Sequence, residues 1–88
     1  MEKSLSDLLF EEKETLQRID AVERSINTFE EEKERILESV HSIYVDQRHI
    51  DFCNRNIEGY KQDVKELNEK LLYIRRGMQE YLSYIMSL

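Results

Sequence analysis

His49 and Cys53 come closer than any other residues of this 88-residue chain to the types and spacing that a chemical site requires. On a helix they would share one face, because residues four apart are neighbours, and Asp46 and Asp51 lie near them in the sequence. Zinc in proteins takes three or four ligands, however, and the sequence has no CxxC or HxxxH pair to supply the rest. We therefore predict no metal site and no cofactor.

Catalytic motifs are also missing from the sequence. It has no glycine-rich phosphate loop, no nucleophile elbow and no paired catalytic carboxylates. A helical rod, which the patterns below predict, offers no cleft that would exclude water from a reaction. We expect a protein that is not an enzyme and has no small-molecule substrate.

The apolar residues of the second half are spaced as in a coiled coil. Their steps alternate between three and four residues to the end of the chain: Ile50, Cys53, Ile57, Tyr60, Val64, Leu67, Leu71, Ile74, Met78, Tyr81, Ile85 and Leu88. This is a seam of heptad positions a and d, with Ile50 at a. The pattern predicts a long helix that buries one stripe against another helix, and it makes Cys53 a small core residue first.

The first half carries a second, wider seam. With Leu5 at position a, the seam is apolar except at Glu12, Thr15 and Lys33; it comprises Leu5, Leu8, Glu12, Thr15, Ile19, Val22, Ile26, Phe29, Lys33, Ile36, Val40 and Ile43. Position e is apolar as well at Leu9, Leu16, Leu37 and Tyr44. A stripe of this width favours a bundle of three or more helices, and polar seam residues restrict register and partner number.

The two seams are out of phase near the middle of the chain. Continuing the first frame puts Gln47 at position a, whereas the second frame needs Ile50 there. One explanation is a continuous coiled-coil helix with a local stammer. The other, which we favour, is an all-α antiparallel two-helix coiled-coil hairpin that associates into a larger helical bundle. We predict one domain, 1–88, with a first helix at 5–44, a turn or phase slip at 45–52 and a second helix at 53–88.

Composition limits the classes of partner. The net charge is −6 and there is no Lys/Arg cluster, so we expect no nucleic-acid binding, which depends on phosphate neutralisation. No apolar stretch approaches the ~20 residues of a membrane span, and the acidic start does not read as a signal peptide. A single cysteine is typical of a reducing compartment, so we expect a cytoplasmic protein.

The two ends of the chain are unusually apolar. The last residues read YLSYIMSL, and Leu8, Leu9 and Phe10 would lie beside them in a hairpin. Contiguous apolar surface on a small protein usually marks an interface. Together with the seam, these ends give a predicted interface comprising Leu8, Leu9, Phe10, Lys33, Leu67, Leu71, Tyr81, Leu82, Tyr84, Ile85, Met86 and Leu88.

Two functions fit these patterns. One is a non-catalytic adaptor or small subunit that binds another helical protein through the seam and the apolar ends. The other is a structural rod that oligomerises with itself. The size and acidic two-helix layout also resemble the small helical hairpins that accompany type VII secretion substrates, which would imply a partner or targeting role. The WxG turn of that superfamily is missing, since the chain has no Trp and its glycines are Gly59 and Gly77.

Overall fold

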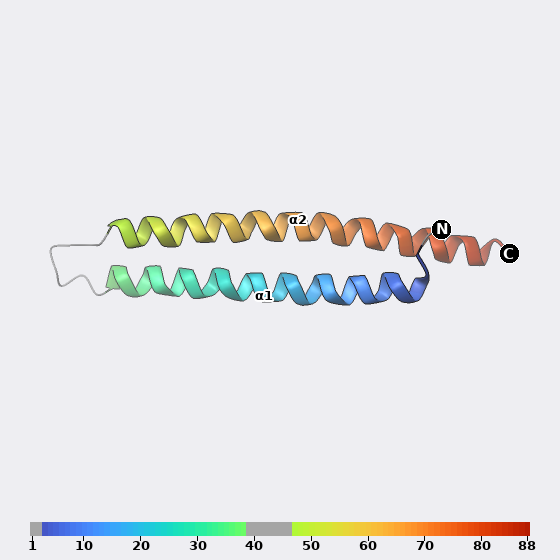
Figure 1. Ribbon diagram of the computed structural model, residues 1–88, viewed down its shortest axis with the longest axis horizontal. Coiled ribbons are helices and arrows are strands. Elements are labelled where there is room, and N and C mark those ends of the chain that lie inside the picture. Colours follow the sequence, from blue (N-terminus) through green and yellow to red (C-terminus); the bar gives the residue numbers. More distant parts are fainter. Residues whose placement is uncertain (1–2, 39–46) are drawn as a thin grey trace.

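The computed structural model is a hairpin of two long antiparallel helices (Figure 1). Helix α1 spans Leu5–Glu38 and helix α2 spans Gln47–Met86. The structure describes residues 3–38 and 47–88, and the rod measures 71 × 15 × 14 Å. The predicted all-α hairpin is confirmed. The alternative of one continuous helix is wrong, because α1 and α2 pack against each other along the rod.

A reciprocal pair of hydrogen bonds starts α1. The amide of Asp7 donates to Ser4 Oγ at 3.2 Å, and the amide of Ser4 donates to Asp7 Oδ2 at 3.3 Å. This arrangement is a capping box, which satisfies backbone donors that the first helical turn leaves without a partner. The cap fixes the start of α1 at Leu5. This start determines how far α1 covers the C-terminal part of α2.

The second helix begins earlier than the sequence predicted. We expected a turn at 45–52 and a helix from 53, but α2 is helical from Gln47. Ile50 is buried against α1, and Gln47 Nε2 donates to Asp51 Oδ1 at 2.9 Å one turn further on. Packing and this local bond therefore place the start of the helix before residue 53. The predicted end of the first helix, 39–44, lies outside the described residues.

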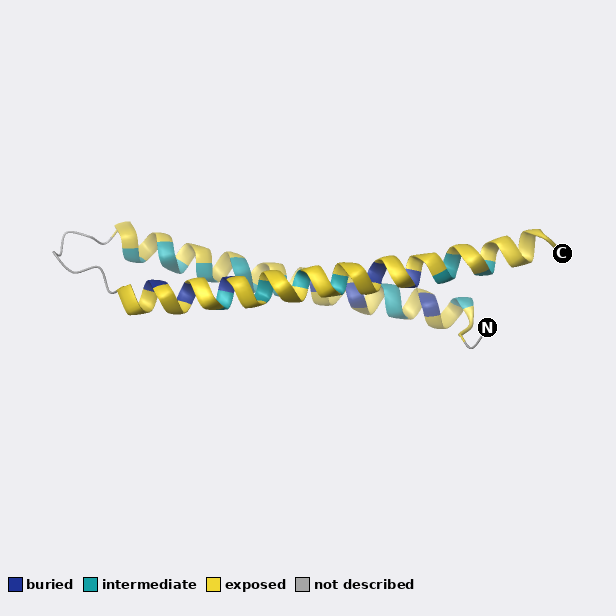
Figure 2. Ribbon diagram, turned by 90° about the horizontal axis from the view of Figure 1, so that it is seen from above, coloured by how far each residue is buried: buried dark blue, intermediate teal, exposed yellow. Residues whose placement is uncertain are grey.

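Both heptad frames are confirmed by burial. Every described a and d position of α1, and those of α2 as far as Tyr81, is buried or half-buried between the helices (Figure 2). The most deeply buried seam residues are Leu8, Thr15, Ile19, Ile50, Cys53, Ile57, Leu71 and Ile74. The apolar residues at position e behave differently: Leu9, Leu16 and Leu37 are exposed, because two helices alone do not cover that edge.

Two of the three polar seam residues find partners inside the hairpin. The hydroxyl of Thr15 is buried and donates to the backbone carbonyl of Glu11 at 2.7 Å. The carboxylate of Glu12 accepts from Arg75 Nε of α2 at 3.1 Å. Since a buried polar group is costly only when it lacks a partner, these residues fit the seam without a further protein.

Contacts between the helices fix their register. Leu8 lies beside Gly77 near one end, and Phe29 packs near the other end with ring centroids 6.1 Å from Phe52 and 5.9 Å from Tyr60. Because Leu8 stands opposite Gly77 and the helices are antiparallel, the start of α1 at Leu5 lies level with about residue 80 of α2 at ~1.5 Å per residue. Figure 1 shows the end of α2 extending past the start of α1.

Candidate functional site

Exposed apolar side chains gather towards the end of the rod that holds both termini, here called the open end. Among the described residues, all but two of the large apolar side chains that are exposed lie in that half of the rod. They form what we call the open-end surface: Leu9, Phe10, Leu16, Leu72, Tyr73, Leu82, Tyr84, Ile85, Met86 and Leu88. The two exceptions, Leu37 and Phe52, lie towards the opposite end of the rod. Apolar surface concentrated in this way is characteristic of a binding interface.

The last residues of the chain, 81–88, form an overhang: Tyr81 is still half-buried against α1, but the seam beyond it has no cover within the described chain. Leu71 at position a is 6% exposed, whereas Ile85 at the equivalent position is 45% exposed and Leu88 at position d is 89% exposed. The heptad spacing continues without change through both regions. The difference arises because α1 begins at Leu5 and so provides no helical turn beside the overhang. The apolar seam of α2 therefore continues past the start of α1.

One edge of the hairpin extends this apolar surface along the rod. Leu9 and Leu16 occupy position e of α1, and Leu82 occupies position e of α2. In an antiparallel pair the e positions of the two helices flank the same side of the seam. The wide apolar stripe of the first half therefore continues into the open-end surface.

Ion pairs border the open-end surface. Lys3 Nζ lies 2.6 Å from Glu11 Oε1, and Arg75 is paired with Glu12. The hydrogen bond to Glu11, and secondarily the charge of that carboxylate, raise the pKa of Lys3 above its ordinary value. An apolar centre with a charged border is the usual anatomy of a protein interface.

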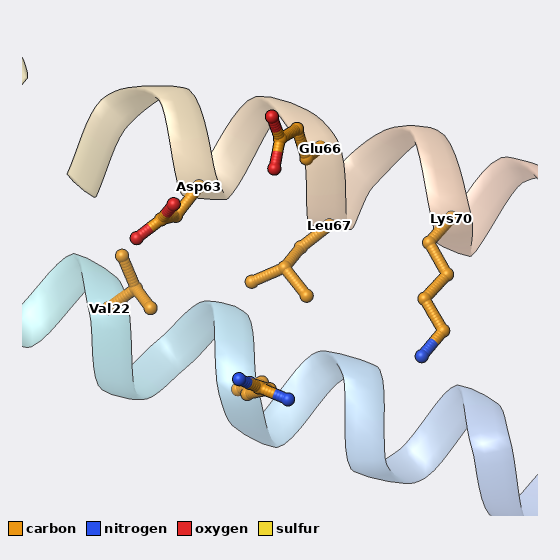
Figure 3. A pocket seen from close by; sticks show the side chains of 6 residues that line it. Val22, Asp63, Glu66, Leu67 and Lys70 are labelled. Atoms are coloured by element: carbon orange, nitrogen blue, oxygen red, sulfur yellow. The ribbon is translucent and has the colours of Figure 1, made fainter. Parts of the chain in front are cut away.

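The remaining hollows of the rod are shallow. Two overlapping grooves of about 350 and 340 Å³ flank Leu67 at the centre. In the first groove the side chains of Val22 and Leu67 occupy the space between the helices, with Asp63, Glu66 and Lys70 around them (Figure 3). Arg18 and Lys70 balance the two carboxylates there, so the groove gives no net attraction for a charged ligand.

A third groove, of about 320 Å³, belongs to the open end. It is lined by Lys3, Leu8, Glu11, Tyr73, Ile74, Gly77 and Glu80. Leu8 is buried at the base of this groove beside Gly77, where a β-carbon would stand 3.6 Å from Leu8 Cδ2. The groove adds Tyr73 to the apolar area that a partner could cover.

Cys53 and His49, the pair with metal-ligand spacing, have other surroundings in the structure. Cys53 is a free thiol buried completely in the seam, and His49 Nε2 lies 3.7 Å from Glu32 Oε1. Within residues 3–38 and 47–88, no group of three His, Cys, Asp or Glu side chains could hold a metal ion. Asp46 lies outside the described residues. No helix in the described part of the chain is long and apolar enough to span a membrane.

The predicted interface residues divide into two groups. Leu8 and Leu71 are buried, and Lys33, Leu67 and Tyr81 are half-buried, so these five belong to the contact between α1 and α2. The others are exposed at the open end: Leu9, Phe10, Leu82, Tyr84, Ile85, Met86 and Leu88. The prediction omitted Leu72 and Tyr73, although apolar residues at the outer positions b and c were a visible signal.

Comparisons with known proteins find no similar protein. No protein-family model, no curated protein and no solved structure matches the chain.

Proposed function

We propose that the protein is a non-catalytic coiled-coil adaptor or small subunit whose open end binds a helix. The observation that carries this proposal is the exposed seam of the overhang. Ile85 and Leu88 continue the heptad spacing of Leu71 and Ile74 but have no helix beside them in the described chain. A helix with this spacing is stabilised by a second helix, so a partner helix is the occupant that fits.

The rest of the open-end surface supports the same role. Tyr, Met and Leu side chains next to the overhang enlarge the apolar area, and ion pairs surround it. Aromatic and Met residues are the types enriched in interface cores. The single free cysteine, Cys53, supports a cytoplasmic location, where thiols stay reduced.

A structural rod that spaces two partners is the second candidate. The 71 Å length of the hairpin favours it, because most of that length is a solvated two-helix shaft. The two candidates differ in whether the end of the rod opposite the open end binds a partner. A spacer needs a binding site at both ends of the rod, whereas an adaptor of the kind proposed needs only the open end.

Two matched substitutions test the proposal. Leu82 and Leu37 both occupy position e, are 48% and 51% exposed, and lie towards opposite ends of the rod. Leu82→Glu should weaken association by about tenfold or more, because it places a charge in a covered apolar contact, whereas Leu37→Glu should leave association unchanged. Association is measured as the mass of the purified chain in solution and as the proteins that co-purify with it from its source cell.

Together the two variants distinguish the adaptor from the spacer rod. Loss of association in Leu82→Glu alone supports the adaptor. Loss in both variants favours the spacer rod, because both ends would then bind. Wild-type behaviour of both variants contradicts the proposed use of the open end.

A further inference from the structure

We propose that the groove beside Gly77 binds a basic side chain, an arginine or a lysine, of the helix that docks at the open end, with the charge of that side chain at Glu80. This inference rests on the proposed function of the open end and goes further by naming the chemistry of one contact residue of the partner. The site is the third groove, of about 320 Å³, to which both helices and Lys3 contribute.

The groove has an apolar floor and an aromatic wall. Leu8 of α1 and Ile74 of α2 are almost fully buried at its base, whereas Tyr73 is 77% exposed. Tyr73, Gly77 and Glu80 follow one another along one face of α2, because they are spaced four and three residues apart. A long basic side chain suits this shape, since its methylene stem packs on apolar surface while its charged end stays at a polar rim.

The charges of the groove favour a cation. The lining contains one lysine and two glutamates, Lys3, Glu11 and Glu80, and so carries a net charge of −1. Lys3 is bound to Glu11 at 2.6 Å, whereas Glu80 has no ion pair within the described chain. An incoming cation therefore meets a carboxylate that no other described side chain neutralises.

Lys3 shows that this groove already holds an ammonium group. Its Nζ donates to Glu11 Oε1, and both residues line the groove together with Tyr73. The hydrogen bond to Glu11 raises the pKa of Lys3 most, and the negative charges of Glu11 and Asp7 act in the same direction. A tyrosine ring also attracts a cation that lies over its face. The surroundings of the groove therefore stabilise positive charge, and Glu80 extends them along α2.

Gly77 leaves room for the stem of such a side chain. Glycine destabilises the interior of a helix, and the contacts within the hairpin do not require it here, because a β-carbon would make only an ordinary contact with Leu8 at 3.6 Å. Glycine is the residue that lets a ligand approach the backbone closely. A side chain that lies over Gly77 uses this space, and it reaches Glu80 one helical turn further on.

Other side chains fit the groove less well. An acidic side chain would be repelled by Glu80. An aliphatic side chain would fill the floor, but its apolar end would take water from the carboxylate of Glu80 without giving it a hydrogen-bond donor. A basic side chain alone covers the apolar floor and also compensates the carboxylate.

Nuclear magnetic resonance on the purified, isotope-labelled chain tests the site without a partner. The probe is Nα-acetyl-arginine amide, and the control is Nα-acetyl-citrulline amide, which has a similar shape but no charge, at equal ionic strength. We expect the backbone amide signals of Tyr73, Gly77 and Glu80 to shift at least about threefold more with arginine than with citrulline. Signals of the acidic run Glu30–Glu34 should shift less than those of the groove.

Four variants test the parts of the groove separately. Glu80→Gln keeps the shape and removes the charge, so the arginine-specific shift should fall by about threefold. Gly77→Ala should also reduce the shift, whereas Gly59→Ala, at a position of the same helix that meets open space, should leave it unchanged. Lys3→Ala should increase the shift, because it leaves Glu11 available to the probe. Circular dichroism checks that all four variants keep their helicity.

Two results of the titration would overturn the site. One is equal shifts with arginine and citrulline, and the other is arginine-induced shifts spread evenly over the acidic residues of α1. An unchanged shift in both Glu80→Gln and Gly77→Ala would also overturn the assigned position of the side chain.

The protein that co-purifies with the chain separates this inference from the proposed function. Glu80→Gln should lower its yield by about threefold or more, as expected for the loss of one charge pair. If Leu82→Glu loses this protein and Glu80→Gln retains it in full, the basic contact is wrong and the proposed function stands. If Leu82→Glu retains it, the proposed function is wrong, whereas the arginine titration still decides whether the groove binds a cation.

Discussion

At the scale of single residues, burial within the seam differs between positions of the same heptad type. Leu71 is almost fully buried between the helices, whereas Leu67 is half-buried and borders the two central grooves. The sequence predicted both as equivalent seam residues, since periodicity reports which side of the helix a residue occupies. It does not report how closely the opposing helix packs there, which depends on the side chains of both helices together.

This difference predicts unequal losses of stability. Leu71→Ala should lower the free energy of unfolding by about 2–5 kcal/mol, as is usual for a buried leucine, and Leu67→Ala should cost less than half as much. Urea unfolding followed by circular dichroism measures both under identical conditions. Equal losses, or a larger loss at position 67, would show that the centre of the seam is packed more closely than the structure has it.

At the scale of the helices, the sequence predicted the two elements and their frames but left open how they connect. The phase change near Ile50 fitted either a stammer or a turn, because the segment contains neither Gly nor Pro. The start of α2 at Gln47 was missed because Asp46, directly before it, is only one of several residues of the N-cap type in this segment, with Asp51 and Asn54. Burial of Ile50 against α1 is a tertiary contact, which the local sequence does not report. The start of α1 was easier, since Ser4 and Asp7 are recognisable capping residues.

The two glycines of α2 give a prediction at this scale. Gly in a helix interior costs about 0.8–1 kcal/mol relative to Ala. A β-carbon at Gly59 would meet open space, and one at Gly77 would make an ordinary contact with Leu8 at 3.6 Å. Gly59→Ala and Gly77→Ala should therefore each raise the free energy of unfolding by roughly 0.5–1 kcal/mol. A loss at Gly77 alone, in the same unfolding assay, would mean that α1 lies closer to α2 there.

At the scale of the whole molecule, the hairpin is a shaft with one apolar end. The apolar ends and the start of α1 at Leu5 were visible in the sequence, but the exposure of these ends depended on a fact that only the fold supplies: the register of α1 leaves the α2 seam beyond Tyr81 uncovered. The sequence also left open whether the apolar residues at position e are buried or exposed. Leu9 and Leu16 are core in a bundle of three or more helices and exposed in a hairpin, and the spacing of residues is identical in both cases.

The central claim is that another helix covers the overhang when the protein is assembled, and amide hydrogen exchange along α2 tests it most directly. Exchange is compared between the assembled state, with a second copy or a protein partner, and the dissociated chain. We predict that the amides of residues 81–88 exchange at least about tenfold more slowly in the assembly, while those of residues 50–74, already covered by α1, change little. Equally fast exchange of residues 81–88 in both states would contradict the claim.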